Sequence, residues 1–199
     1  MKYKESDLNI SFDPSWRSRR FDTSRYFKAL SGLGLKGVDF IAIDDEHRLY
    51  LIEVKNYKKR LRSPVAPDIS DLMGDVPLLQ YHFVDKIDDS RQLLEVIYKY
   101  LHRKWWYRSL FRMRNLLTTS VVQSLEWVFW YDAFKIANTA HTDVYCILLL
   151  ETEDYYPALS KKQLTEHVEN LLYHSSFALR RNTGSVEVLD LDQWEEKYC

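Results

Sequence analysis

Two neighbouring runs of β-prone residues constrain the fold of this 199-residue chain most strongly. They are GVDFIAI, residues 37–43, and RLYLIEVK, residues 48–55, and the polar turn DDEH separates them. Two such runs joined by a short polar turn predict an antiparallel hairpin. Apolar residues fall on both faces of both runs, so we expect the hairpin to lie inside a sheet that is covered on both sides.

The segments that precede and follow this hairpin predict helices and further strands. Residues 1–22 are expected to be largely irregular, and Thr23 or Ser24 can cap a short helix after them. Residues 56–140 are mostly helical in pattern, with one helix expected to begin at Asp89, which has capping-box spacing to Gln92. The other expected elements are a helix over 121–137, a buried strand over 143–151, an amphipathic helix over 160–179 and a strand over 185–191.

The order of these elements predicts the fold class. A strand, a helix and a strand at the end of the chain indicate a parallel crossover, whereas the hairpin is antiparallel. We therefore expect an α/β fold with a mixed central sheet flanked by helices, in a single domain over residues 1–199. A long helical insertion, about residues 65–140, separates the hairpin from the third strand.

Composition excludes several classes of protein. Hydrophobic residues are 46% and charged residues 29% of the chain, which is typical of a globular domain. Two cysteines are too few for a disulfide framework, and the formal net charge of −1 means that binding of a polyanion would depend on local basic patches. The N-terminus lacks the apolar core of a signal peptide and no apolar run approaches about 18 residues, so we expect a cytoplasmic protein without membrane insertion.

Three charged residues mark the open end of the hairpin. Glu53 and Lys55 share one face of their strand because side chains alternate along a strand. If the loop holds three residues, 45–47, Asp44 pairs with Arg48 and Asp39 lies opposite Glu53. A loop of two or four residues would instead place the two acids on opposite faces, unless a bulge intervenes.

The odd register brings together a chemically coherent group. Two neighbouring carboxylates resist joint ionisation unless a cation lies between them, and hard divalent ions such as Mg²⁺ prefer oxygen ligands. A metal ion there would polarise a phosphodiester and lower the pKa of a bound water, while Lys55 could orient that water or stabilise developing charge. The alternative is a cross-strand ion pair at the rim of the sheet with no catalytic role.

Asp39 followed by IEVK on the next strand resembles the motif of the PD-(D/E)XK nuclease superfamily, which has the restriction-endonuclease-like fold. The resemblance covers roughly residues 22–60 and 140–191. It implies that Asp39, Glu53 and Lys55 are catalytic, that Asp39, Glu53 and the Val54 carbonyl hold Mg²⁺ or Mn²⁺, and that the substrate is nucleic acid, with DNA preferred from family habit.

The chain also departs from the pattern of this family. Val38 stands where many members have proline before the aspartate, and the first helix has no clear glutamate ligand, for which Asp22 and Glu5 are the available substitutes. A Gln-x-x-x-Tyr motif does not follow, so the resemblance assigns no subfamily.

Two basic segments are candidates for nucleic-acid contacts. The first, residues 55–62, contains Lys58, Lys59, Arg60 and Arg62, and its alternative is a solvated loop. The second, residues 98–117, interleaves tryptophan and tyrosine with basic residues that include Arg103, Lys104 and Arg108. This aromatic insertion could equally pack in the core, lie on a membrane surface, or bind a partner protein or a second copy of the chain.

The sequence thus predicts a metal-dependent nuclease and leaves two other classes of function open. One is a catalytically inactive module of the same fold that binds nucleic acid or scaffolds a complex. The other is a helical adaptor for a partner protein or a membrane surface, in which the hairpin is merely structural.

Overall fold

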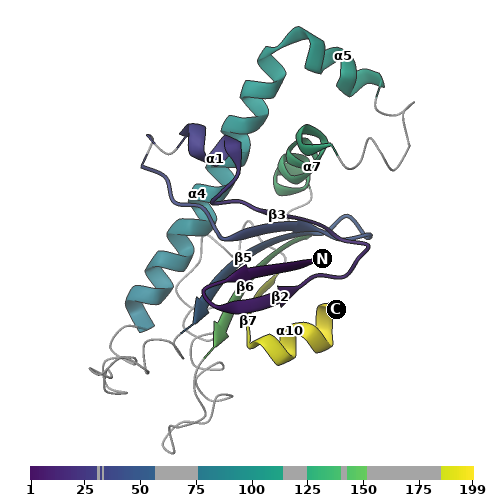
Figure 1. The fold of residues 1–199 in the computed structure, drawn as a ribbon. Helices are drawn as coiled ribbons and strands as arrows, with labels where there is room; N and C mark the ends of the chain where they lie inside the picture. The colour runs from purple at the N-terminus through teal and green to yellow at the C-terminus, as the bar shows by residue number, and fades with distance from the viewer. Residues whose placement is uncertain (31, 33, 57–75, 114–124, 140–142, 152–184) are drawn as a thin grey trace, which may run out of the picture.

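The computed structural model describes residues 1–30, 32, 34–56, 76–113, 125–139, 143–151 and 185–199. Its centre is a five-stranded sheet in the spatial order β3-β4-β5-β6-β7 (Figure 1). The strands are β3 Arg17–Arg20, β4 Phe40–Ile43, β5 Leu49–Asn56, β6 Val144–Glu151 and β7 Ser185–Leu189. Pairing is antiparallel from β3 to β5 and parallel from β5 to β7, which confirms the mixed sheet.

Further elements cover both faces of this sheet. They are the hairpin of β1 Lys2–Glu5 and β2 Leu8–Ser11, and the helices α1 Arg25–Leu30, α4 Val76–Arg103, α5 Trp105–Met113, α7 Glu126–Thr139 and α10 Leu191–Tyr198. Figure 1 shows α1, α4 and α7 on one side of the sheet and the β1–β2 hairpin with α10 on the other. The mixed α/β class is therefore confirmed.

The sheet is buried on both sides, as the two-faced apolar pattern predicts. Leu49 and Leu51 point into a hydrophobic cluster shared with α4 and α7. Tyr50 and Ile52 point the other way, into a second cluster that includes Trp194 of α10. All four side chains are at most 1% exposed, so β5 is an interior strand along this stretch.

The turn of the β4–β5 hairpin sets the register on which the site depends. The Asp44 N–H donates to the Arg48 carbonyl at 3.2 Å, and Phe40 pairs with Ile52. Three residues, 45–47, form the loop, and its last residue, His47, has a φ of 64°, the left-handed conformation expected there in three-residue hairpin loops. The odd register is therefore confirmed.

The expectation of an irregular N-terminus is wrong, because residues 1–20 contain three strands. Ser6 and Asp7, with φ values of 49° and 65°, form the tight turn between β1 and β2. Strand β3 carries three arginines, so it lacks the apolar alternation by which strands are recognised. Its arginines are tolerated because β3 is an edge strand of the sheet.

The expected helix start at Asp89 is also wrong, because α4 begins at Val76 and runs through this position. The Asp89 carboxylate instead accepts the Lys36 N–H at 2.7 Å, a contact to a distant segment. The helix expected over 121–137 begins at Glu126 within the described residues.

Several other predictions can be compared with the structure. Ser24 caps α1 by accepting the Phe27 N–H at 3.1 Å, and the strands expected over 143–151 and 185–191 are β6 and β7. Helix α10 was not anticipated, although Asp190 and Gln193 form a capping box at its start. The helix expected over 160–179 lies outside the described residues.

None of the described helices combines the length and the apolar character that crossing a bilayer would require.

Candidate active site

Asp39 and Glu53 lie where strands β4 and β5 diverge. Continuing the register beyond the Phe40–Ile52 pair places Asp39 opposite Glu53 on the same face of the sheet. Beyond this pair, the Val54 N–H donates to the Asp39 carboxylate at 2.7 Å and the Val38 N–H donates to Ser90 Oγ at 2.9 Å. These two backbone N–H groups thus bond to side chains instead of to the neighbouring strand, and the bond from Val54 orients Asp39.

A third residue, which the sequence analysis missed, joins the two acids. Lys86 of α4 places its ammonium 2.7 and 2.8 Å from the two Glu53 carboxylate oxygens. The same ammonium lies 3.8 Å from Asp39 Oδ1. The two carboxylates are thus near enough to share one cation.

Lys55 contacts the same group from β5 itself. Its ammonium lies 2.7 Å from Glu53 Oε1, and about a third of its side chain is exposed. Glu53 is fully buried, whereas Lys86 is partly exposed. The predicted trio of Asp39, Glu53 and Lys55 is brought together, and together with Lys86 it forms the carboxylate–lysine cluster.

Burial and a neighbouring charge raise the pKa of Asp39. Removal from water and the neighbouring charge of Glu53 raise the pKa of Asp39 from 3.8 to about 7, although Lys86 and the Val54 N–H act in the opposite direction. Burial disfavours a charged carboxyl, and a second carboxylate nearby adds repulsion. A cation bound between the two acids would favour the charged form of Asp39 and lower this pKa.

Helix α4 is fastened against the chain segment that leads into β4. Asp89 accepts the Lys36 N–H, and Ser90 accepts the Val38 N–H and donates to the Lys86 carbonyl at 2.7 Å. Residues three and four apart share a helix face, so Lys86, Asp89 and Ser90 all point toward this segment. Lys86 flanks the apolar stripe of Phe83, Ile87, Leu94 and Ile97, whose side chains are buried in the core. This position indicated that Lys86 lies near the core but not that it reaches Glu53.

The two proposed substitutes for a further acidic ligand have another partner. Arg20 forms an ion pair with Glu5, and its Nε lies 3.8 Å from Asp22 Oδ1, a buried oxygen without a hydrogen-bond partner. Within the described residues, no group of three or more histidine, cysteine or acidic side chains is arranged to hold a metal ion. A metal at this site would thus have two carboxylate ligands from the described part of the chain.

The donor set fits a hard divalent ion on one condition. Asp39 and Glu53 supply oxygen ligands around a shared cation position, and ions such as Mg²⁺ retain several waters beside one or two protein carboxylates. The condition is that the Lys86 ammonium leaves that position, because a metal ion and an ammonium repel each other there. Val54 lies between Glu53 and Lys55 on β5. That its carbonyl is a further metal ligand stays a prediction.

The residues predicted to contact nucleic acid are placed only in part. Lys58, Lys59, Arg60 and Arg62 lie outside the described residues, as does the side chain of Arg108. Arg103 is exposed at the end of α4. Lys104 lies between α4 and α5 and lines a cavity that is separate from the carboxylate–lysine cluster.

No protein-family model matches the chain, and neither a curated protein nor a solved structure gives a match.

Proposed function

We propose that the chain is a metal-dependent nuclease that hydrolyses phosphodiester bonds, with DNA as the first substrate to test. The observation that carries this proposal is the shared cation position between Asp39 and Glu53, with Lys55 on the same strand face. It is the arrangement expected of the PD-(D/E)XK motif, whose restriction-endonuclease-like fold we propose for this chain.

Each residue of the cluster has a distinct role in this proposal. Asp39 and Glu53 would hold Mg²⁺ or Mn²⁺, with Asp39 oriented by the Val54 N–H. When bound, such an ion polarises a phosphodiester and lowers the pKa of a water. Lys55 is exposed enough to reach a phosphate oxygen and offset charge that develops there.

Lys86 supports a second candidate function. An ammonium that pairs with Glu53 at 2.7 Å and lies 3.8 Å from Asp39 could replace a metal permanently, as expected of a catalytically inactive module that binds nucleic acid or scaffolds a complex. The two candidates differ in whether a divalent ion can displace Lys86.

Cleavage of a mixed panel of DNA and RNA substrates in Mg²⁺, Mn²⁺ or EDTA tests the proposal. We expect cleavage that needs the metal and falls at least about 100-fold in Glu53→Gln and in Lys55→Ala, because the first change removes a metal ligand and the second removes the ammonium beside the reacting phosphate. Glu187→Gln is a matched control, since Glu187 forms a comparable pair with Lys197, at 2.6 Å, on strand β7 of the same sheet.

Cleavage that survives in Glu53→Gln would place the activity elsewhere and refute this site. Absence of cleavage by the wild-type protein, with binding of nucleic acid retained, would favour the inactive module.

A further inference from the structure

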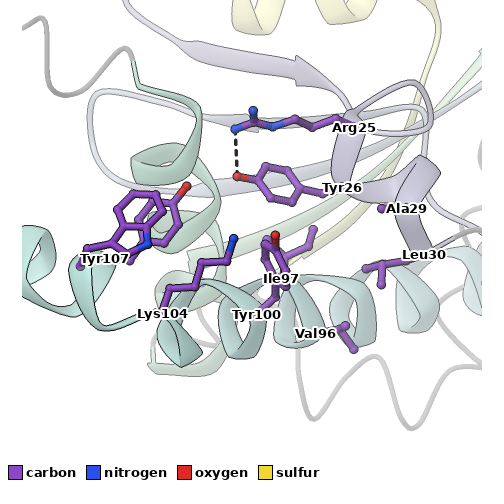
Figure 2. Close-up of a pocket in the computed structure, with 10 residues that line it drawn as sticks. Arg25, Tyr26, Ala29, Leu30, Val96, Ile97, Tyr100, Lys104 and Tyr107 are labelled. Atoms are coloured by element: carbon purple, nitrogen blue, oxygen red, sulfur yellow. Dashed lines mark hydrogen bonds between the residues drawn. The ribbon is translucent and has the colours of Figure 1, made fainter.

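A cavity of about 550 Å³ lies between α1, the second half of α4 and the start of α5. Its residues are Arg25, Tyr26, Ala29, Leu30, Val96, Ile97, Tyr100, Lys104, Trp106 and Tyr107 (Figure 2). Ligand pockets typically measure about 300–1,000 Å³, so this one suits a ligand of the size of a nucleotide. We call it the aromatic pocket.

The break between α4 and α5 creates this pocket. Helix α4 ends at Arg103 and α5 begins at Trp105, with Lys104 between them. Trp106 stacks on Tyr107 with ring centroids 3.6 Å apart, and Tyr107 is largely buried in the core. Trp106 itself stays 42% exposed, so a supported aromatic face borders the pocket.

The charge of the pocket is positive. Within the described part of the chain, two of its lining residues are cations and none is a carboxylate. The Lys104 ammonium lies 4.8 Å from the centroid of the Tyr100 ring, and Figure 2 shows it extending into the space between α4 and Tyr26. Arg25 donates to the Tyr26 hydroxyl at 3.1 Å and forms an ion pair with Glu126, outside the pocket, at 3.0 Å. Among the described residues, Lys104 is therefore the lining cation that pairs with no carboxylate.

We propose that the aromatic pocket binds one unstacked nucleotide of a single-stranded nucleic acid. The base stacks on Trp106, and the adjoining phosphate pairs with the Lys104 ammonium. This inference rests on the proposed nuclease function, because it names the form of nucleic acid that the chain would hold.

Two features favour a single strand over the other occupants. Aromatic side chains stack on base faces that are covered in a duplex but open in a single strand. An apolar segment of a partner protein would bury the Lys104 ammonium without an anion to compensate its charge, which is costly. The pocket also lies on the same helix as Lys86, and the 14 residues from Lys86 to Tyr100 span about 21 Å of α4, a distance that several nucleotides can bridge.

Fluorescence anisotropy in EDTA tests the inference without any contribution from metal-dependent cleavage. The probe is a labelled single strand of about 12 nucleotides, compared with its duplex and with an abasic strand of the same length. We expect Trp106→Ala to weaken binding at least about fivefold and Trp106→Phe to restore most of the loss, because stacking on one base contributes about 1–3 kcal/mol. Lys104→Gln should lower the salt dependence of binding by about one phosphate contact, a slope of about 0.7.

Two neighbouring residues outside the pocket supply the controls. Trp105 is 73% exposed and Lys99 pairs with Glu95, and neither lines the cavity. Trp105→Ala and Lys99→Gln should therefore bind the single strand within about twofold of the wild type. Thermal melting of each variant checks that the loss of binding is not a loss of folding.

Equal binding by wild type and Trp106→Ala, equal affinity for the single strand and the abasic strand, or no binding at all would each overturn the inference. Binding in EDTA with no cleavage in Mg²⁺ would refute the nuclease proposal alone. Metal-dependent cleavage with no sensitivity to Trp106→Ala would refute the pocket alone.

Discussion

The carboxylate–lysine cluster and the aromatic pocket handle charge in opposite ways. In the cluster, a fully buried Glu53 accepts two ammonium groups and Asp39 accepts a backbone N–H. In the pocket, Lys104 lies over the half-exposed ring of Tyr100. Arg25 lies over the buried ring of Tyr26. The cluster is thus built around a position for a cation, and the pocket is built around a position for an anion and a flat ring.

The two regions therefore differ in what they contribute to stability and to binding. Buried charges that lose a partner are costly, whereas exposed ion pairs contribute little. Substitutions in the cluster should therefore affect folding and metal affinity, and those in the pocket should affect affinity for the ligand.

Glu53→Gln should lower the free energy of unfolding by about 2–3 kcal/mol, because Lys55 and Lys86 lose the charge that they share. Urea denaturation at neutral pH measures this change. Glu53→Gln combined with Lys86→Met should recover part of the loss, since one unpaired ammonium is then removed. A single variant as stable as the wild type would show that the cluster does not hold α4 to the sheet.

Asp39→Asn should become more stable than the wild type as the pH rises. The pKa of Asp39 is about 7 in the folded protein and 3.8 ordinarily, so folding favours the protonated carboxyl. This contribution to the stability of the wild type is fully present below about pH 4 and is lost as the pH rises through 7. Asparagine stays neutral, so the variant should gain stability relative to the wild type between about pH 4 and pH 8, by at least about 1.4 kcal/mol, the free energy that corresponds to a difference of about one in pKa. Urea denaturation across this range measures the gain.

Asp45→Asn is the control for that experiment, because Asp45 is exposed in the hairpin turn and removing its charge leaves the cluster intact. A stability difference between Asp39→Asn and the wild type that does not change with pH would contradict the assigned environment of Asp39.

Glu126→Gln should have the smallest effect on stability, below about 1 kcal/mol, because its pair with Arg25 is largely exposed. It should also tighten binding of a single strand by about two- to fivefold, since Arg25 is then available to a phosphate. Denaturation and anisotropy measure the two effects. Weaker binding in this variant would mean that Arg25 must be held by Glu126 to line the pocket.

The sequence predicted the part of the site that depends on local geometry. The strand pattern within residues 37–55 predicted that Glu53 and Lys55 share a face, and it left open whether the loop has the odd length that places Asp39 opposite Glu53. The structure decided the loop length. Burial on both faces followed from apolar residues at every position from Leu49 to Ile52.

What the sequence did not predict depends on contacts between distant segments. Lys86 reaches Glu53 because Asp89 and Ser90 bind the segment before β4, and no local pattern records that docking. The Asp89 carboxylate accepts the Lys36 N–H instead of capping a helix, which is why the capping-box spacing at Asp89 did not correspond to a helix start. Strand β3 was missed because its arginines are accommodated by its position at the sheet edge, and that position is set by β4.

Titration with Mn²⁺, followed by the electron paramagnetic resonance signal of the free ion, tests the central claim that Asp39 and Glu53 share one cation position. We predict that the wild type binds the ion, that Glu53→Gln weakens this binding by at least about tenfold, and that Lys86→Met tightens it by at least about tenfold because the competing ammonium is gone. No binding of Mn²⁺ by the wild type, or weaker binding by Lys86→Met, would contradict the claim.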